Sequence, residues 1–484
     1  MKQKGFLVFL LAWAAYVAVY IFNSSIVVSG QRYFALNDDA MISMQYAKNL
    51  SLGNGLVWSL DAKVQGITNP LWTLAMALPM AAKVPLPYCP LVVQIFGALF
   101  MLATLFKLRR LGRALDLKEP AIWGGVLLSA FFSSLASWVY MGMEVCVLVF
   151  LVTWIACLVA EDGSDAEIYL LAALCVLVRI DMASLFVALL LFRGQRAMGL
   201  GLALAAVACQ MAFSKAYYGD WLPNTYYLKM GSFPLKLRLI KGSLTLFKNT
   251  YYMGWFSFLL PLWLWQKGKP WKTLLLLVAG QMAYSVYVGG DAWDDRGGAN
   301  RYFSVAMPIL FMLFSAALWK LCGHFTKEHR RVLFAGLAFM AWLNFNSTKG
   351  NRSLNEVLCP VHDKAANEDA LPTALYLKQN TPVDAKIAMG NAGTIPFYSE
   401  HKYYVDILGK NDAVVAHGPT YPMDSLWTLF ISKPGHMKWN LDHSIGELKP
   451  DYVVPPGLAP LDAPAFAARG YQATSWPTVM KRKV

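Results

Sequence analysis

The chain has 484 residues, of which 57% are hydrophobic and 15% are charged, and its mean hydropathy is +0.41. This composition is too apolar for a soluble protein of this length and indicates a membrane protein. The net charge of +14 would suit a nucleic-acid binder, but the lysines and arginines gather in short loops between apolar runs, so we interpret them as determinants of membrane topology.

The first apolar run, Gly5–Val28, follows two lysines and is too long for the core of a signal peptide. We predict an uncleaved first span with a cytoplasmic N-terminus. The next segment, residues 29–88, contains a short apolar run at 71–82, below the roughly 20 residues that a spanning helix needs. If that run crossed the membrane, the basic cluster 107–113 would lie outside, against the positive-inside rule. We therefore predict that 71–82 is re-entrant or lies on the surface, and that 29–88 is a loop on the outer side of the membrane.

An acidic pair stands in this loop where a helix is predicted to begin. Asn37 suits the N-cap, and Asp38 and Asp39 fall in the first turn, where a carboxylate gains about 0.3–1 kcal/mol from the helix dipole. That structural role explains the pair without any function. The alternative is catalysis, in which only one of the two can face a substrate directly, because neighbours on a helix diverge by about 100°.

Further apolar runs alternate with basic loops up to residue 345. Keeping every dense Lys/Arg loop in the cytoplasm gives about eleven spans. A polar and aromatic outer loop, 214–249, interrupts them, and residues 1–345 form the predicted transmembrane domain. After the first span, the predicted spans are residues 91–106, 122–139, 145–160, 168–178, 182–192, 200–213, 251–265, 273–288, 302–321 and 332–345.

From about residue 346 the sequence becomes more polar and richer in Pro and Gly. We predict a small soluble α/β domain, 346–484, on the outer side of the membrane. Its predicted strands lie at 385–390, 403–408 and 451–454, and its predicted helix lies at 369–379.

The seven cysteines show no metal-ligand spacing, and most lie in apolar runs, where they behave as small hydrophobic residues. Cys89 and Cys359 are the pair that could both face the oxidising side, so a bridge between them is the one disulfide considered.

Charged side chains gather at the predicted outer ends of the spans. Ionisable groups at membrane depth cost a few kcal/mol each, so groups near span ends are functional candidates. For Asp294 and Asp295, simple solvation in a loop is the plainer interpretation, and for Arg179 and Asp181 it is a mutual ion pair. The whole set is Asp38, Asp39, Glu144, Asp181, Asp291, Asp294, Asp295, Arg179, Lys229, Arg296 and Arg301.

Three motifs in the first outer loop resemble membrane glycosyltransferases of the GT-C superfamily. They are Asp38-Asp39-Ala-x-Ile-Ser-x-x-Tyr-Ala-x-Asn-Leu, Gly53-Asn-Gly-Leu-Val-Trp58 and Gly66-Ile-Thr-Asn-Pro-Leu-Trp72. The sequence is most similar to the arabinofuranosyltransferases that build mycobacterial arabinan termini and to their pilin-modifying relatives. The likeness continues through Gly142-Met-Glu144, Arg179-Ile-Asp181, 219–229, Gly289-Gly-Asp291, Arg301-Tyr-Phe303, 393–398 and 406–412.

The chain departs from this family in two ways. Ile180 stands where the family often has proline after the arginine, and the chain is shorter than the mycobacterial members. The second departure leaves the acceptor open.

The resemblance implies a polytopic α-helical GT-C fold in a bacterial inner membrane, so that the loops 29–88 and 214–249 and the domain 346–484 are periplasmic. It implies that the donor is a monosaccharide carried on polyprenyl phosphate, with D-arabinofuranose as the first candidate. The implied acceptor is a periplasmic glycan or a pilin-like protein. Asp38 is then the general base that deprotonates the acceptor hydroxyl, and Asp39 orients Asp38 or the sugar. Whether the reaction inverts or retains configuration stays open.

The remaining roles follow from the same resemblance. Arg301 is the predicted ligand of the donor phosphate, supported by Lys229 and Arg179, because a guanidinium binds phosphate bidentately. No cofactor is required, although Glu144 and Asp291 are candidates for holding a divalent cation. The predicted contacts to sugar or acceptor are Glu144, Asp291, Tyr46, Thr68, Asn69 and Asn224.

Two other functions fit the same sequence. One is an O-oligosaccharyltransferase that moves a lipid-linked glycan to protein. The other is a non-enzymatic transporter of lipid-linked sugars, which would place charges near the membrane midplane, whereas the charges here lie mostly at span ends. The leading hypothesis requires Asp38 and Arg301 to converge on one pocket.

Overall fold

The computed structural model describes residues 3–294, 300–322 and 354–483, except 421–431 and 458–460, and scattered residues between 338 and 351. Its contacts divide the chain into two units, each assembled from separate segments. We call them the helical unit, Met1–Asn23 with Gln94–Gln210 and Arg238–Val361, and the mixed unit, Ser24–Val93 with Met211–Leu237 and His362–Val484.

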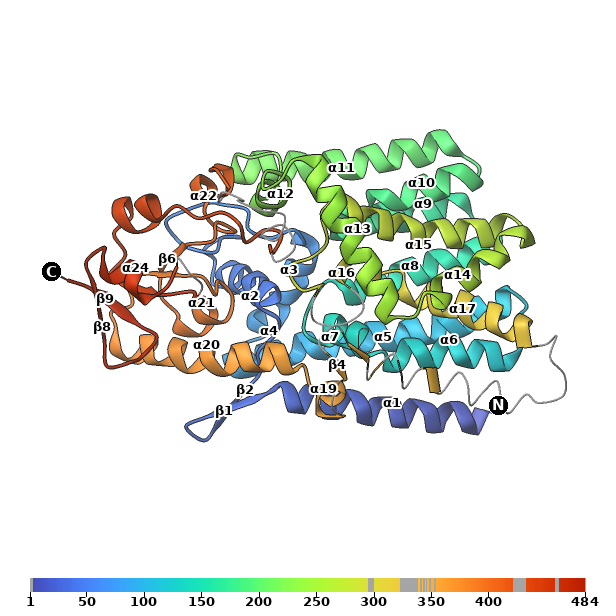
Figure 1. Ribbon diagram of the computed structural model, residues 1–484, viewed down its shortest axis with the longest axis horizontal. Coiled ribbons are helices and arrows are strands. Elements are labelled where there is room, and N and C mark those ends of the chain that lie inside the picture. The colour runs from blue at the N-terminus through green and yellow to red at the C-terminus, as the bar shows by residue number, and fades with distance from the viewer. Residues whose placement is uncertain are drawn as a thin grey trace. The chain divides into compact units, whose positions relative to one another are not determined.

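The helical unit consists mainly of helices that run side by side (Figure 1). Helices α5, α11 and α13 continue across the boundary between the units. The elements are α1 (Gln3–Ser24), α5 (Cys89–Ala114), α6 (Glu119–Phe131), α7 (Ser133–Tyr140), α8 (Val145–Ala160), α9 (Asp165–Val178), η2 (Ile180–Ser184), α10 (Leu185–Phe192), α11 (Arg196–Tyr218), α13 (Leu235–Tyr252), α14 (Phe256–Leu259), η3 (Leu260–Lys267), α15 (Lys269–Tyr287), α16 (Arg301–Ser304), α17 (Met307–Cys322), β3 (Asn346–Ser347), β4 (Gly350–Asn351) and α19 (Leu354–Leu358).

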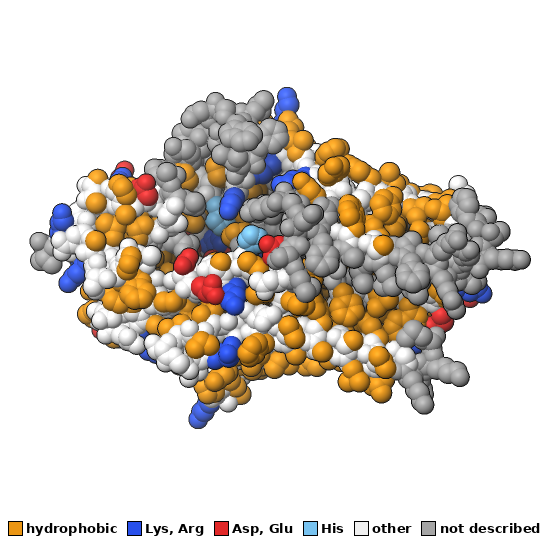
Figure 2. All heavy atoms as spheres, turned by 60° about the horizontal axis from the view of Figure 1, so that its bottom comes forward, with side chains coloured by type: hydrophobic (Ala, Val, Ile, Leu, Met, Phe, Trp, Pro, Cys, Tyr) orange, Lys and Arg blue, Asp and Glu red, His pale blue; other side chains and the backbone are white. Residues whose placement is uncertain are grey.

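Among the described residues, three helices are long and apolar enough to cross a membrane: Gly5–Ser24, Leu86–Ala114 and Arg196–Tyr218. A fourth span results if α6 and α7, bent by 56°, count as one. Several other apolar helices are shorter, so these elements do not establish the predicted count of about eleven. The last predicted span, 332–345, lies largely outside the described residues. Hydrophobic side chains cover much of the face drawn in Figure 2, as expected for a surface that meets lipid.

The predicted periplasmic loop 214–249 is largely helical. It contains α12 (Asn224–Met230) and most of α13. On α13 the apolar Leu239 and Phe247 are exposed, whereas Arg238 and Lys241 are buried. Apolar residues outside and cations inside are the reverse of a soluble helix, and they fit a helix whose outer surface meets lipid.

The mixed unit contains a five-stranded sheet in the order β6-β5-β7-β9-β8. Strand β5 pairs in parallel with β6 and β7, and β9 is antiparallel to β7 and β8. The strands are β5 (Lys386–Met389), β6 (Tyr403–Asp406), β7 (Tyr452–Val454), β8 (Tyr471–Ala473) and β9 (Met480–Arg482). The first three coincide with the predicted strands, because runs such as Lys386-Ile-Ala-Met389 bury almost every side chain.

The other elements of this unit are short, apart from the helices Asp38–Ser51 and Val361–Asn380. The predicted helix at 369–379 lies inside α20 (Val361–Asn380). The predicted re-entrant run 71–82 forms two helices of seven and four residues, too short to cross a membrane. The full set is β1 (Ile26–Val28), β2 (Gln31–Tyr33), α2 (Asp38–Ser51), α3 (Pro70–Met76), α4 (Leu78–Ala81), η1 (Leu86–Tyr88), α12, α20, α21 (Thr394–Ser399), α22 (Ala413–His417), η5 (Asp442–Glu447) and α24 (Ala463–Ala467).

The register of the parallel strands determines where two loops begin. Met389 lies opposite Asp406 at the carboxyl ends of β5 and β6. The loop that leads from β5 to α21 and the loop that follows β6 therefore leave the sheet at the same edge, where open α/β sheets place their functional groups.

The disulfide considered for Cys89 and Cys359 is not formed. Both cysteines are buried thiols outside any disulfide. The thiol of Cys89 lies 3.2 Å from the carbonyl oxygen of Val84, and that of Cys359 lies 3.4 Å from the carbonyl oxygen of Asn23.

Candidate active site

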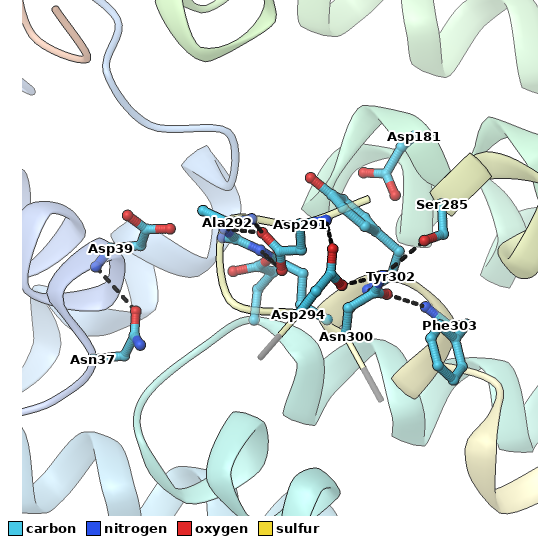
Figure 3. Close-up of polar contacts among 12 residues, drawn as sticks. Asn37, Asp39, Asp181, Ser285, Asp291, Ala292, Asp294, Asn300, Tyr302 and Phe303 are labelled. Carbon is cyan, nitrogen blue, oxygen red and sulfur yellow. Dashed lines mark hydrogen bonds and ion pairs between the residues drawn. The ribbon is translucent and has the colours of Figure 1, made fainter. Parts of the chain in front are cut away.

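The acidic pair begins α2, as the capping pattern predicts. The Asn37 side chain accepts a hydrogen bond from the Asp39 backbone N–H at 3.1 Å and donates one to Asp363 Oδ1 at 2.9 Å. Asp38 and Asp39 occupy the first turn. Figure 3 shows the contact between Asn37 and Asp39. The cap orients the turn, but it leaves both carboxylates available for other partners.

The two aspartates have different partners. Lys410 Nζ lies 2.6 Å from Asp39 Oδ1, and Lys410 is only 8% exposed. Asp38 Oδ1 accepts a hydrogen bond from the Gly393 backbone N–H at 3.0 Å. Among the described residues, Asp38 forms no ion pair. Asp39 is therefore neutralised by a cation, whereas Asp38 is held by a neutral donor.

The loop that carries Lys410 is fixed by Asp406, which is 1% exposed. Asp406 Oδ1 accepts from the Leu408 N–H at 3.0 Å, and Oδ2 accepts from the backbone and side-chain N–H groups of Asn411, each at 2.9 Å. Gly409 has φ +81°, a conformation that favours glycine. These contacts fix Gly409 and Asn411, the residues on either side of Lys410, and so hold Lys410 in place.

Two predicted sugar contacts support this loop. The hydroxyl of Tyr46 lies 2.9 Å from Asn411 Oδ1 and accepts from the Gly66 N–H at 2.8 Å. Asn224 Nδ2 donates to the Gly409 carbonyl at 3.4 Å. Both side chains are buried. Their observed contacts are structural, and their predicted role toward a sugar stays a prediction.

The other two predicted contacts of the first loop lie beside α3. Asn69 is buried, and its Oδ1 accepts from Ser43 Oγ and Thr73 Oγ1, each at 3.1 Å. Thr68 is partly buried. Asn69 thereby links α2 to α3.

Burial raises the pKa of Asp38 to about 6, and the charge of Asp39 adds to the shift, while Lys410 and the Gly393 N–H oppose it. Burial also raises the pKa of Asp406. Asp38 therefore remains ionised at neutral pH but binds a proton more strongly than an exposed aspartate, as a general base should.

Lys229 and His436 belong to the same unit. The stem of Lys229 runs along Gly435, whose added Cβ would lie 3.5 Å from Lys229 Cε and Cγ. Burial, followed by the positive charge of Lys410, lowers the pKa of His436 to about 3, and Lys229 contributes in the same direction. A neutral imidazole therefore lies near two lysines.

The predicted arginines belong to the helical unit. Arg301 donates to both oxygens of Asp291, from Nε at 2.8 Å and from Nη2 at 2.9 Å. Arg179 donates to both oxygens of Asp181 at 2.6 and 3.0 Å and to Glu144 Oε1 at 2.8 Å. The ion pair predicted between Arg179 and Asp181 is confirmed. The predicted role of both arginines toward a phosphate remains a prediction.

Glu144 and Asp291 do not fit the divalent-cation site considered for them. Both are buried, and each carboxylate is engaged by a guanidinium. Within the described ranges, no three His, Cys, Asp or Glu side chains are arranged to hold a metal ion.

Asp294 is not the solvated loop residue expected from the sequence. Its Oδ2 accepts from the Asp291 N–H at 2.6 Å, and its Oδ1 accepts from Asn300 Nδ2 at 3.1 Å, as drawn in Figure 3. Asn300 also donates to Ser285 Oγ at 2.7 Å and caps α16. Burial, with Asp291 adding, raises the pKa of Asp294 to about 7. Asp295 and Arg296 lie outside the described residues.

Solved structures resemble this chain over most of its length. ArnT from Cupriavidus metallidurans bound to undecaprenyl phosphate has a TM-score of 0.54 at 11% identity, over 83% of this chain and 86% of that one. The apo form gives 0.51 at 12% identity over the same shares. The apo oligosaccharyltransferase of Archaeoglobus fulgidus gives 0.53 at 10% identity, over 94% of this chain and 69% of that one. The chain has the GT-C fold.

Two further comparisons concern the sequence. Residues 362–482 match a family described as a domain of unknown function (DUF8728). No curated protein matches the chain. The coarse resemblance to the GT-C superfamily is thus supported by the fold, and the finer one to arabinofuranosyltransferases stays a prediction.

From the sequence alone, no role was predicted for Lys410, Asn411 or His436. Lys410 and Asn411 belong to the 406–412 motif of the resemblance, which was the available signal. Their link to α2 is not visible in sequence, because Lys410 and Asp39 are 371 residues apart. His436 carries no motif that would single it out.

Gly393 is expected to tolerate no side chain. A Cβ at this position would lie 2.3 Å from the Asp38 carbonyl oxygen, 2.6 Å from Asp38 Oδ1 and 2.7 Å from Met41 Cβ. Because backbone atoms cannot yield cheaply, Gly393→Ala should lower the free energy of unfolding by about 1–3 kcal/mol, measured by thermal unfolding. Gly446→Ala is the matched control, since its Cβ would meet nothing within 4 Å. Equal stability of the two variants would contradict this contact.

Proposed function

We propose that the chain is a glycosyltransferase that moves a monosaccharide from polyprenyl phosphate to a hydroxyl of a periplasmic glycan or protein. D-arabinofuranose is the first candidate for the monosaccharide. The observation that carries the proposal is the state of Asp38, a partly buried carboxylate that accepts from the Gly393 N–H, has a raised pKa and forms no ion pair among the described residues. It lies in the motif that resembles the GT-C first loop. The fold supports it, because one structure of similar fold holds undecaprenyl phosphate.

In the proposed reaction the acceptor oxygen attacks the anomeric carbon of the donor. The acceptor proton passes to Asp38, the bond between the anomeric carbon and the phosphate oxygen breaks, and polyprenyl phosphate leaves with its electron pair. General-base catalysis of this kind contributes about 10²–10⁴-fold to a rate. Asp39 stays ionised beside Lys410 and holds the turn in which Asp38 lies.

The leaving phosphate gains negative charge and needs a cation. We assign this role first to Lys229, which lies in the same unit as Asp38 and near His436. Arg301 and Arg179 are the second choice, because they belong to the helical unit and Asp38 belongs to the mixed unit. Asp38 and Arg301 belong to different units, and their convergence remains a prediction.

Transfer should depend on pH through Asp38. The base acts only when it is ionised, so kcat/KM should be half-maximal near pH 6 and fall about tenfold per pH unit below that value. A pH profile of the purified enzyme, measured where its thermal unfolding temperature is constant, checks the midpoint. If kcat/KM were instead half-maximal near pH 4, Asp38 would be exposed to water during catalysis.

The deciding experiment supplies the purified chain in nanodiscs with synthetic polyprenyl-phosphate sugars that differ in the sugar, together with candidate acceptors, and detects product by mass spectrometry. Release of polyprenyl phosphate together with a glycosylated acceptor supports the proposal. Absence of both with every sugar would overturn it.

Block transfer of a glycan is the second candidate, favoured by the fold shared with an archaeal oligosaccharyltransferase. It predicts consumption of a diphosphate-linked oligosaccharide and no use of a monophosphate-linked monosaccharide. Movement of a lipid-linked sugar across liposomes without an acceptor would instead indicate a transporter.

A further inference from the structure

The residues that match a domain of unknown function supply one partner to each aspartate of the acidic pair. Gly393 and Lys410 lie within 362–482, in the loops that leave β5 and β6 at one edge of the sheet. We propose that this segment forms one side of the active site, where Lys410 and the Gly393 N–H make two adjacent aspartates unequal, keeping Asp39 ionised and leaving Asp38 to take the proton. This inference rests on the proposed function.

Adjacent aspartates in one helical turn begin with the same chemistry and repel each other when both are ionised. Without further partners, either could hold the proton, and a base shared between two positions would face the acceptor only part of the time. The contact of 2.6 Å between Lys410 Nζ and Asp39 Oδ1 removes that ambiguity, because an ammonium stabilises the ionised form of the carboxylate that it touches.

The segment is tied to α2 on the Gly393 side by several buried contacts. Lys48 Nζ, on α2, donates to the carbonyls of Pro396 and Phe397 at 3.2 and 2.7 Å. The indole N–H of Trp58 donates to the Ala392 carbonyl at 2.8 Å. The turn that presents the Gly393 N–H is therefore held at both ends.

The Lys410 side is equally well fixed. Asp406 organises the loop through its bonds to Leu408 and Asn411, and Asn411 meets Tyr46 of α2. Lys410 is buried, so its ammonium has lost most of its water and depends on the carboxylates around it. We infer that Lys410 and Gly393 are positioning residues that act through Asp38 and Asp39.

The charged groups that face Asp38 are Asp39, from its own helix, and Lys410 and Asp406, from the loop after β6. Removing Lys410 deletes the positive charge of this group and leaves the three carboxylates of Asp38, Asp39 and Asp406. Lys410→Met should therefore raise the pKa of Asp38 and move the acid limb of kcat/KM upward by about one pH unit. Asp39→Asn should move the acid limb of kcat/KM to lower pH. It removes a negative charge beside Asp38, and Lys410, without its partner carboxylate, can then interact with Asp38.

The test measures pH profiles of the full-length wild type, Lys410→Met, Lys410→Arg and Asp39→Asn, with Lys449→Met as a control for loss of an exposed lysine. We expect opposite shifts in the methionine and asparagine variants, and wild-type behaviour in the control. Lys410→Arg should restore the midpoint. Midpoints unchanged in both variants would overturn the inference while leaving the proposed function intact.

A second measurement does not depend on activity. Carbodiimides modify protonated carboxyl groups, and mass spectrometry locates the modified residue. In the wild type, Asp38 should be labelled below about pH 6 and Asp39 should be protected, whereas in Lys410→Met both should be labelled. Equal labelling of the two aspartates in the folded wild type would overturn the inference, even if no donor sugar were accepted.

Discussion

Asp38→Asn is expected to reduce sugar transfer by about 10²–10⁴-fold and to leave the fold intact. The amide has nearly the same shape and can still accept the hydrogen bond from the Gly393 N–H, but it cannot take a proton from the acceptor. Because burial disfavours the charged form of Asp38, the neutral amide should not lower the thermal unfolding temperature at neutral pH. Initial rates with saturating donor and the unfolding temperature of the same preparation measure both effects.

Asp384→Asn is the matched control, because Asp384 is an exposed aspartate of the same unit that pairs only at the surface with Lys402. It should keep wild-type rates. Wild-type turnover by Asp38→Asn would contradict the assignment of the base. A large loss accompanied by a fall in unfolding temperature would show instead that the carboxylate is needed for folding.

Local signals predicted the parts of the site that neighbouring residues determine. Asn37 and the two aspartates follow capping preferences, and the structure confirms that cap. The strands after residue 385 were readable because short apolar runs between turn residues are typical of buried strands. Arg179 and Asp181 stand two positions apart, so their ion pair was also open to local reasoning.

Contacts made over long stretches of sequence were beyond that reasoning. The partner of Asp39 is 371 residues away and that of Asp38 is 355 residues away. Both depend on the parallel pairing of β5 and β6, which a single sequence does not specify. The sequence also shows arginines at the predicted span ends, but it does not show that Arg179 forms an ion pair with Glu144 and Arg301 with Asp291.

The same limit explains the division of the chain. A change in composition near residue 346 predicts a separate cap, whereas contacts group 24–93 and 211–237 with 362–484. The proposed base therefore lies in a unit built from three segments. A change of composition reports where apolar spans end, but it does not report which polar segments pack together.

Arg179→Met is expected to lower the free energy of unfolding by about 3–5 kcal/mol. Arg179 and Glu144 are 3% and 1% exposed, and the substitution would leave two buried carboxylates, Glu144 and Asp181, without their cation. Thermal unfolding of the purified chain measures the change. Arg196→Met, which removes an exposed arginine, should have little effect.

The role predicted for Arg179 toward the donor phosphate can be separated from this structural role. In the triple variant Arg179→Met, Glu144→Gln and Asp181→Asn, no charge remains to be compensated, so most of the lost stability should return. If Arg179 also binds the phosphate, this stable variant should show a KM for the donor above that of Glu144→Gln alone, the comparison that removes any effect of the predicted sugar contact of Glu144. If its KM equals that of Glu144→Gln, the arginine serves only to join α8 and α9 to η2, and the phosphate must be held elsewhere, by Lys229 first.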